Sequence, residues 1–314
     1  MQSADRSWDP EAYKSGYQGV EAAETFPTAT ALADYRRMLL DDTEREVGFI
    51  ARHVGRRKLR VMDLGSGNGR LLVRLALDGM LEFGLGVEIS RSRVAFAERW
   101  VRDLGLGCIR TVGADVLEFD GFRQASFDLV TCLSDAFSYF RPIREDAPGA
   151  VLARMHAALA PQGCVLLQTY QLSEKRRQLL ALSGGRLRVW RPLPSADRFA
   201  YYLSDIEYLA ARRILIHRKT FIARDGAIDA GRVEVVEHSS RAELLELLRA
   251  GGFDQPQIFG DFEDGAHQDG ESEMLVTLSG LTGWRDQGDA GHSAFAARHS
   301  GKDGPGAWVL EDRA

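Results

Sequence analysis

The sequence predicts an α/β fold, in which a doubly wound sheet with helices on both faces is interrupted by one β-rich insertion. Between Leu59 and Tyr170, short apolar runs alternate with amphipathic stretches, and this order favours parallel strands joined by crossover helices. After Ser173 the helical spacing stops and β-rich runs follow one another. The chain has 314 residues, of which 45% are hydrophobic, so it can bury a core of this size.

Five strands are expected in the first half of the chain, in the runs LRVMDL, FGLGVEI, CIRTVG, FDLVTCL and GCVLLQTY. The clearest helices between them are Arg91–Leu104 and Ala150–Leu159, where apolar residues recur at helical spacing. Similar spacing upstream of the first strand predicts a helix over Asp34–His53.

The insertion is expected to contain three strands, in the runs RFAYYLSDIEYL, RRILIHRKTFIA and GRVEVVEHSS. Asp225-Gly226 predicts a turn before the third of them. A helix over Ala242–Ala250 follows, with Ser239 or Ser240 as N-cap and Gly251-Gly252 as its end. Two last strands are expected around Gln257–Phe259 and Glu273–Leu278.

These elements divide the chain into five parts. They are an N-terminal lid segment (1–45), a cofactor-binding core (46–172), a β-rich substrate insertion (173–238), a helix with strands that completes the core (239–282), and a flexible tail (283–314). The tail is rich in Gly, Asp and Ser and has no periodic apolar pattern, which favours flexibility.

Composition argues against several classes of function. The net charge of −5, with acids and bases interspersed, leaves no basic footprint for a nucleic-acid partner. No apolar stretch approaches the roughly 18 residues of a membrane-spanning helix, and the N-terminus lacks the layout of a signal peptide, so a cytoplasmic protein is expected. The three cysteines are too scattered for a disulfide framework or a metal site. A homo-oligomer is left open.

A glycine-rich turn follows the first strand, in Asp63-Leu64-Gly65-Ser66-Gly67-Asn68-Gly69. A turn between a strand and a helix places a nucleotide-like ligand at the carboxyl edge of the sheet, where glycines let the backbone approach it. A dinucleotide oxidoreductase is the main competitor, but its fingerprint needs a small residue where this chain has Arg70. Because Asp63 would repel a pyrophosphate, the turn favours a cationic amino-acid nucleoside.

Two more acids stand at strand ends. Glu88 ends the second strand, where a carboxylate can accept hydrogen bonds from both ribose hydroxyls. Asp115 follows the third strand, where it can accept a hydrogen bond from an adenine amino group. Each acid alone would be an ordinary surface residue or helix cap, whereas three at successive strand ends beside this turn indicate a nucleoside site.

The segments VMDLGSGNG, GVEIS, GADVLEF, FDLVTCLSDAFSYF and LAPQGCVLLQTY resemble the class I S-adenosylmethionine-dependent methyltransferases, over roughly residues 40–280. The resemblance implies a Rossmann-like, seven-stranded sheet that ends in an antiparallel strand. It also implies S-adenosylmethionine as cofactor, contacted by Gly65, Gly67, Glu88 and Asp115. Asp63 would lie near the methionyl ammonium, Ile89 beside the adenine, and the Cys132–Leu133 backbone at the methionyl part.

The C-terminal run HSSRAELLELLRAGGF…FGDFEDGAHQDGESEML resembles small-molecule methyltransferases, many of which tailor antibiotics or amino sugars in bacteria. The stretch after the fourth strand, SDAFSYF, lacks the Asn/Asp-Pro-Pro-Tyr/Phe of N6-adenine and glutamine methyltransferases. The paired glutamates of arginine methyltransferases are also missing. We therefore expect a small-molecule acceptor, as in secondary metabolism.

The nature of the acceptor depends on Asp135, the one carboxylate in that stretch. An amine acceptor needs no base as it reacts, and Asp135 can orient it through a charged hydrogen bond. Tyr13 and Tyr17 are further candidates, because on a helix they share a face that can close over the site. The alternatives are a hydroxyl acceptor with His217 or His238 as base, and a module that binds the cofactor without catalysis. No metal-ligand spacing is visible.

Overall fold

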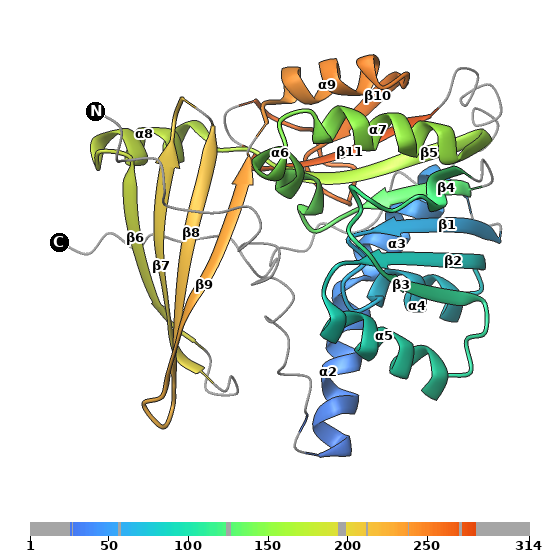
Figure 1. The fold of residues 1–314 in the computed structure, drawn as a ribbon, viewed down its shortest axis with the longest axis horizontal. Coiled ribbons are helices and arrows are strands. Elements are labelled where there is room, and N and C mark those ends of the chain that lie inside the picture. The colour runs from blue at the N-terminus through green and yellow to red at the C-terminus, as the bar shows by residue number, and fades with distance from the viewer. Residues whose placement is uncertain are drawn as a thin grey trace.

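The computed structural model describes residues 26, 28–55, 58–123, 127–193, 199–211, 213–237, 239–269 and 272–280. Its centre is a seven-stranded sheet with the order β10-β11-β5-β4-β1-β2-β3, and a separate four-stranded sheet stands beside it (Figure 1). No helix in the described part of the chain is long and apolar enough to cross a membrane.

The large sheet confirms the expected strands. Its members are β1 (Leu59–Leu64), β2 (Leu81–Glu88), β3 (Ile109–Gly113), β4 (Phe127–Cys132), β5 (Leu159–Tyr170), β10 (Asp254–Phe259) and β11 (Met274–Gly280). The first five strands run parallel, while β11 is antiparallel to both β5 and β10. This is the Rossmann-like arrangement with an antiparallel last strand that the family resemblance implies. The carboxyl ends of β1, β2 and β4 therefore meet at one edge of the sheet.

Helices cover both faces of this sheet. On one face lie α3 (Glu44–His53), α4 (Arg70–Leu77) and α5 (Arg91–Asp103), and on the other lie α7 (Ala147–Ala158) and α9 (Arg241–Ala250) (Figure 1). Successive strand residues serve opposite faces, as when Val61 packs in one apolar cluster and Met62 in the other. Both are fully buried, so the two faces of β1 are equally covered.

The N-terminal helical stretch is two helices rather than one. Helix α2 (Ala29–Asp42) and α3 meet at Thr43, which ends the first and precedes the second. The Thr43 hydroxyl donates to the carbonyl oxygen of Leu39 at 2.6 Å, and its N–H turns back to Leu40. These contacts tighten the last turn of α2, and the chain changes direction there.

The insertion forms the four-stranded antiparallel sheet. Its elements are α8 (Glu174–Leu182), β6 (Arg186–Pro192), β7 (Phe199–Leu209), β8 (Ile214–Ala223) and β9 (Ile228–Glu237). The three expected strands are confirmed, and Asp225-Gly226 lies in the turn between β8 and β9. Helix α8 and strand β6 are additional to the expectation. Helix α8 packs over one end of the sheet, where Leu180 joins Ile206 and Leu215 in a small core.

Two short elements connect β4 to the rest of the core and touch the insertion. The 3₁₀ helix η2 (Ala136–Tyr139) leads into α6 (Phe140–Ile143), and both contact β9. Arg141 pairs with the buried carboxylate of Glu237 at 2.6 Å. The insertion is thereby held against the segment that follows β4.

Candidate functional site

The glycine-rich turn leaves β1 at Leu64 and enters α4 at Arg70. Gly65, Gly67 and Gly69 all have left-handed backbones, with φ of 66°, 57° and 80°. A Cβ on Gly65 would lie 2.8 Å from the Cβ of Ala136, whereas one on Gly67 would lie 3.7 Å from the Arg93 guanidinium. Gly65 is therefore required by both conformation and space, and Gly67 mainly by conformation.

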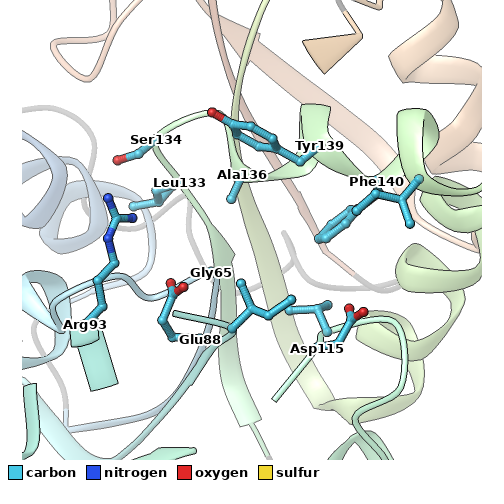
Figure 2. Close-up of a pocket in the computed structure, with 12 residues that line it drawn as sticks. Gly65, Glu88, Arg93, Asp115, Leu133, Ser134, Ala136, Tyr139 and Phe140 are labelled. Carbon is cyan, nitrogen blue, oxygen red and sulfur yellow. The ribbon is translucent and has the colours of Figure 1, made fainter. Parts of the chain in front are cut away.

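A pocket of about 730 Å³, open mouth included, lies at the carboxyl ends of the strands beside this turn. Its lining residues are Gly65, Glu88, Ile89, Arg93, Asp115, Val116, Leu133, Ser134, Ala136, Tyr139, Phe140 and Ile143. Figure 2 shows Asp115 and Phe140 toward one end, Arg93 and Ser134 toward the other, and Glu88 between them. Five of the eight cofactor residues expected from the sequence (Gly65, Glu88, Ile89, Asp115 and Leu133) thus line one cavity.

Glu88 is held rigidly at the end of β2, where its exposed fraction is only 2%. One carboxylate oxygen accepts the N–H of Gly67 at 2.8 Å, and the other accepts the N–H of Ser90 at 2.8 Å. A carboxylate oxygen can accept more than one hydrogen bond, and this side chain borders the pocket. A ribose with two adjacent hydroxyls would fit this acceptor pair.

Asp115 stands at the opposite end of the pocket from Arg93. Its Oδ1 accepts the N–H of Leu117 at 2.9 Å, which fixes the side chain at the end of β3. The lining also includes the apolar side chains of Ile89, Val116 and Phe140. An apolar slot with one acceptor at its edge is suited to an adenine ring and its amino group.

Asp63, Gly67 and Cys132 are next to the pocket rather than among its described lining residues. Gly67 contributes its N–H to Glu88, and Cys132 is fully buried, where burial raises the pKa of its thiol well above the usual value. Asp63 is also buried and accepts the Thr131 hydroxyl at 2.6 Å. Burial raises the pKa of Asp63 to about 7, although Thr131 and Arg70 oppose this shift.

Arg70 connects three parts of the site and was not singled out as a functional residue by the sequence. Its two Nη atoms each lie 2.6 Å from an oxygen of Glu46, in a forked ion pair with helix α3. It also donates to the hydroxyls of Thr43 at 2.7 Å and Ser134 at 3.1 Å. One signal in the sequence could have drawn attention to Arg70. The dinucleotide fingerprint has a small residue at this position, whereas this chain has an arginine.

Asp135 lies immediately after β4, between the lining residues Ser134 and Ala136. Ser134 and Asp135 have φ of 53° and 63°, and two consecutive non-glycine residues in this region indicate stored backbone strain. Oδ1 of Asp135 accepts the Ser138 hydroxyl at 2.5 Å and the Tyr170 N–H at 3.1 Å. Burial raises the pKa of Asp135 to about 7.

The other catalytic candidates expected from the sequence are two tyrosines and two histidines. Tyr13, Tyr17 and His238 lie outside the described residues. His217 lies on β8, where desolvation lowers its pKa to about 4, and no hydrogen-bond partner reaches its buried Nε2 within the described part of the chain. Tyr139, Phe140 and Arg93 line the pocket without having been expected there.

Among the described residues, no group of three or more His, Cys, Asp or Glu side chains could hold a metal ion. Cys108, Cys132 and Cys164 are free thiols.

Residues 61–163 match a protein family described as a methyltransferase domain. These residues form a methyltransferase domain, and its cofactor is S-adenosylmethionine. The matched range runs from β1 to the start of β5 and contains all the described lining of the pocket. The dinucleotide oxidoreductase alternative is therefore dropped.

One protein sequence and two solved structures are among those similar to this chain. A Geobacillus sp. (strain WCH70) protein, provisionally named a methyltransferase, is 26% identical over 216 residues, covering 66% of this chain and 78% of that protein. Among solved structures, the CcbJ methyltransferase of Streptomyces caelestis has a TM-score of 0.65 at 19% identity, covering 76% of this chain and 88% of that one. CalS10 of Micromonospora echinaspora has a TM-score of 0.57 at 19% identity, covering 82% and 99%. The two solved structures share the fold of this methyltransferase.

The residues of the pocket fit S-adenosylmethionine in their chemistry. It offers the fixed acceptor pair of Glu88 at its middle and an apolar slot with one carboxylate at the Asp115 end. At the other end the Gly65 backbone borders the cavity where a side chain would collide with Ala136. Glu88 and Asp115 would then hold the nucleoside, and Gly65 and Leu133 would border the amino-acid part.

Proposed function

We propose that this methyltransferase methylates an amine nitrogen of a small molecule, as in secondary metabolism, and that Asp135 holds the acceptor. The observation that carries this proposal is a half-buried carboxylate without a cationic partner among the described residues. Among the described residues no Arg, Lys or His pairs with Asp135, and both of its hydrogen bonds end on Oδ1. The side chain is partly exposed, so Oδ2 can receive a donor from a ligand.

An ammonium group supplies the charge that this carboxylate lacks. Bound S-adenosylmethionine supplies an activated methyl group on its sulfonium. Asp135 holds the protonated acceptor by a charged hydrogen bond, and it orients the nitrogen once the proton has been lost to water. Arg70 and Gln168 hold the neighbouring Ser134, through its hydroxyl at 3.1 Å and its N–H at 2.8 Å, and so fix the segment that carries Asp135.

The residues around Asp135 and one structural neighbour support an amine rather than a hydroxyl. The segment 134–140 contains no His, Lys or Cys that could remove a proton from a hydroxyl during methyl transfer. CalS10, which shares the fold, is described as an amino pentose methyltransferase of calicheamicin biosynthesis.

A hydroxyl acceptor is the second candidate, because His217 provides a base of the right kind. Its lowered pKa keeps the imidazole neutral near pH 7, and its Nε2 has no protein partner in the described part of the chain. A neutral imidazole can take the proton of a hydroxyl group. His217 belongs to the insertion rather than to the pocket lining.

The test compares acceptors and variants in an assay for S-adenosylhomocysteine formation. A panel of amino sugars is paired with sugars that have a hydroxyl in place of the amine, and turnover is expected only with amines. With the best amine, Asp135→Asn should raise KM roughly tenfold or more, because the amide keeps the shape but loses the charge, while cofactor affinity stays unchanged.

Asp146→Asn is the matched control, since this carboxylate is exposed on the surface and pairs with Arg144. It should leave both constants unaltered. A silent Asp135→Asn together with loss of turnover in His217→Ala would establish the hydroxyl acceptor instead.

A further inference from the structure

Arg93 is a pocket residue to which neither the sequence motifs nor the family resemblance gives a role. It is the third residue of α5, which follows β2 and the ribose carboxylate Glu88. Figure 2 shows its side chain extending past Glu88 toward Leu133 and Ser134. Its Nη1 lies 3.7 Å from the place that a Cβ on Gly67 would occupy, so the guanidinium rests against the glycine-rich turn.

The position of Arg93 along the pocket decides which part of the cofactor it meets. Asp115 and the apolar slot mark the adenine end, and Glu88 marks the ribose. The amino-acid part of S-adenosylmethionine must then extend from the ribose toward Leu133 and Ser134, away from Asp115. The Arg93 guanidinium lies on that side.

The positive charge of Arg93 determines which group of the cofactor it can bind. The amino-acid part of the cofactor carries one anion, its carboxylate, beside two cations, the sulfonium and the ammonium. Among the described residues that line the pocket, Arg93 alone carries a positive charge, while Glu88 and Asp115 are acids. We propose that Arg93 binds the methionyl carboxylate of S-adenosylmethionine and makes this site select ligands that retain it.

The chemistry of the two groups is complementary. A guanidinium presents parallel N–H donors that match the two oxygens of a carboxylate, and it stays charged at any pH at which the protein is folded. A guanidinium has five N–H donors, so Arg93 can bind a carboxylate of the ligand while it keeps its contacts within the protein. The inference concerns the cofactor and is independent of the acceptor proposed above.

The test measures binding by calorimetry with two ligands that differ only in this carboxylate. They are S-adenosylhomocysteine and its decarboxylated form, which retains the adenosine, the thioether and the amine. The wild-type protein should bind S-adenosylhomocysteine roughly ten- to a hundredfold more tightly than the decarboxylated ligand, as expected for a charge-assisted hydrogen-bonded pair.

Arg93→Gln should abolish most of this preference, by weakening S-adenosylhomocysteine binding and leaving the decarboxylated ligand within about twofold of wild type. Arg91→Gln is the matched control, because Arg91 is exposed in the first turn of the same helix and outside the pocket lining. It removes the same charge and should retain the full preference.

Two results would overturn the proposal. One is a wild-type protein that binds both ligands equally, which needs no variant to observe. The other is an Arg93→Gln protein that loses affinity for both ligands by the same factor, as a merely structural residue would. If Arg93→Gln does not fold, as judged by circular dichroism, Arg93→Lys replaces it, and an unchanged preference after loss of the guanidinium fork would count against the proposal.

Discussion

The buried carboxyl of Asp63 makes the stability of the protein depend on pH in a predictable direction. Its pKa is raised from 3.8 to about 7 in the folded protein, mainly by desolvation. The folded state therefore holds this proton more tightly than the unfolded chain between these two values. The resulting stabilisation is fully present below about pH 4 and is lost as the pH rises through 7.

The size of the effect follows from the shift. A difference of 7 − 3.8, or about 3 pKa units, corresponds to about 4 kcal/mol in total at 1.36 kcal/mol per unit. Between about pH 5 and pH 8, roughly 2–3 kcal/mol of this should be observed. Asp63→Asn retains an acceptor for the Thr131 hydroxyl but cannot titrate.

The assay is urea unfolding of the wild-type protein and of Asp63→Asn across this range. Other titrating groups contribute equally to both proteins, so the difference in their free energies of unfolding isolates Asp63. The variant should gain roughly 2–3 kcal/mol over wild type as the pH rises from about 5 to 8. A difference that does not vary with pH would show that Asp63 is an ordinary ionised carboxylate and would refute this reasoning.

The same carboxyl also tests the proposed place of the cofactor ammonium. An ammonium group beside Asp63 would favour its ionised form, so binding of S-adenosylhomocysteine near pH 6.5–7, where the carboxyl is still partly protonated, should release a fraction of a proton. Calorimetry in two buffers of different ionisation enthalpy measures that proton. Wild type should release it and Asp63→Asn should not, whereas equal release from both would place the ammonium elsewhere.

Three further substitutions follow from the geometry. Glu88→Gln can accept only one of the two backbone N–H groups that the carboxylate holds, so it should lose roughly 1–3 kcal/mol of stability in melts and bind S-adenosylhomocysteine roughly ten- to a hundredfold more weakly in calorimetry. Unchanged affinity would reject the ribose assignment. Gly65→Val should abolish measurable cofactor binding, because its φ of 66° and the 2.8 Å approach to Ala136 exclude a branched side chain. Normal binding by Gly65→Val would move the site elsewhere. Ser240→Ala should cost about 1 kcal/mol in denaturant unfolding without affecting binding, since it removes the capping box with Glu243 at the start of α9. A loss of cofactor affinity there would mean that α9 is coupled to the pocket.

Much of the fold could be predicted from the sequence because it is encoded over short stretches. The seven strands of the large sheet and helices α5, α7 and α9 follow from local periodicity and capping, and their observed bounds differ from the expected ones by a few residues. Strand β6 was missed although Leu187 and Val189 alternate with arginines, which is a period-two signal. Helix α8 was missed although Ser173 is a regular N-cap for it.

The site was less predictable where it depends on contacts between distant residues. The strand-end acids Glu88 and Asp115 could be found because the carboxyl ends of parallel strands meet at one edge. The forked ion pair between Arg70 and Glu46 joins residues 24 positions apart, so it cannot be predicted from a local sequence pattern. The local sequence marks Asp63 only as a charge, whereas burial in the folded protein raises its pKa to about 7.

The four-stranded sheet is formed by the part of the chain between β5 and α9. In the described residues it shares no strand pairing with the seven-stranded sheet. The described lining of the cofactor pocket lies wholly outside it. The strand pairing of the core sheet therefore does not depend on residues 173–238, and side chains such as Glu237, which pairs with Arg141, join the insertion to the core. Because the sequence predicts that this insertion serves the substrate, we expect that relatives with a different insertion keep the methyl donor and accept other molecules.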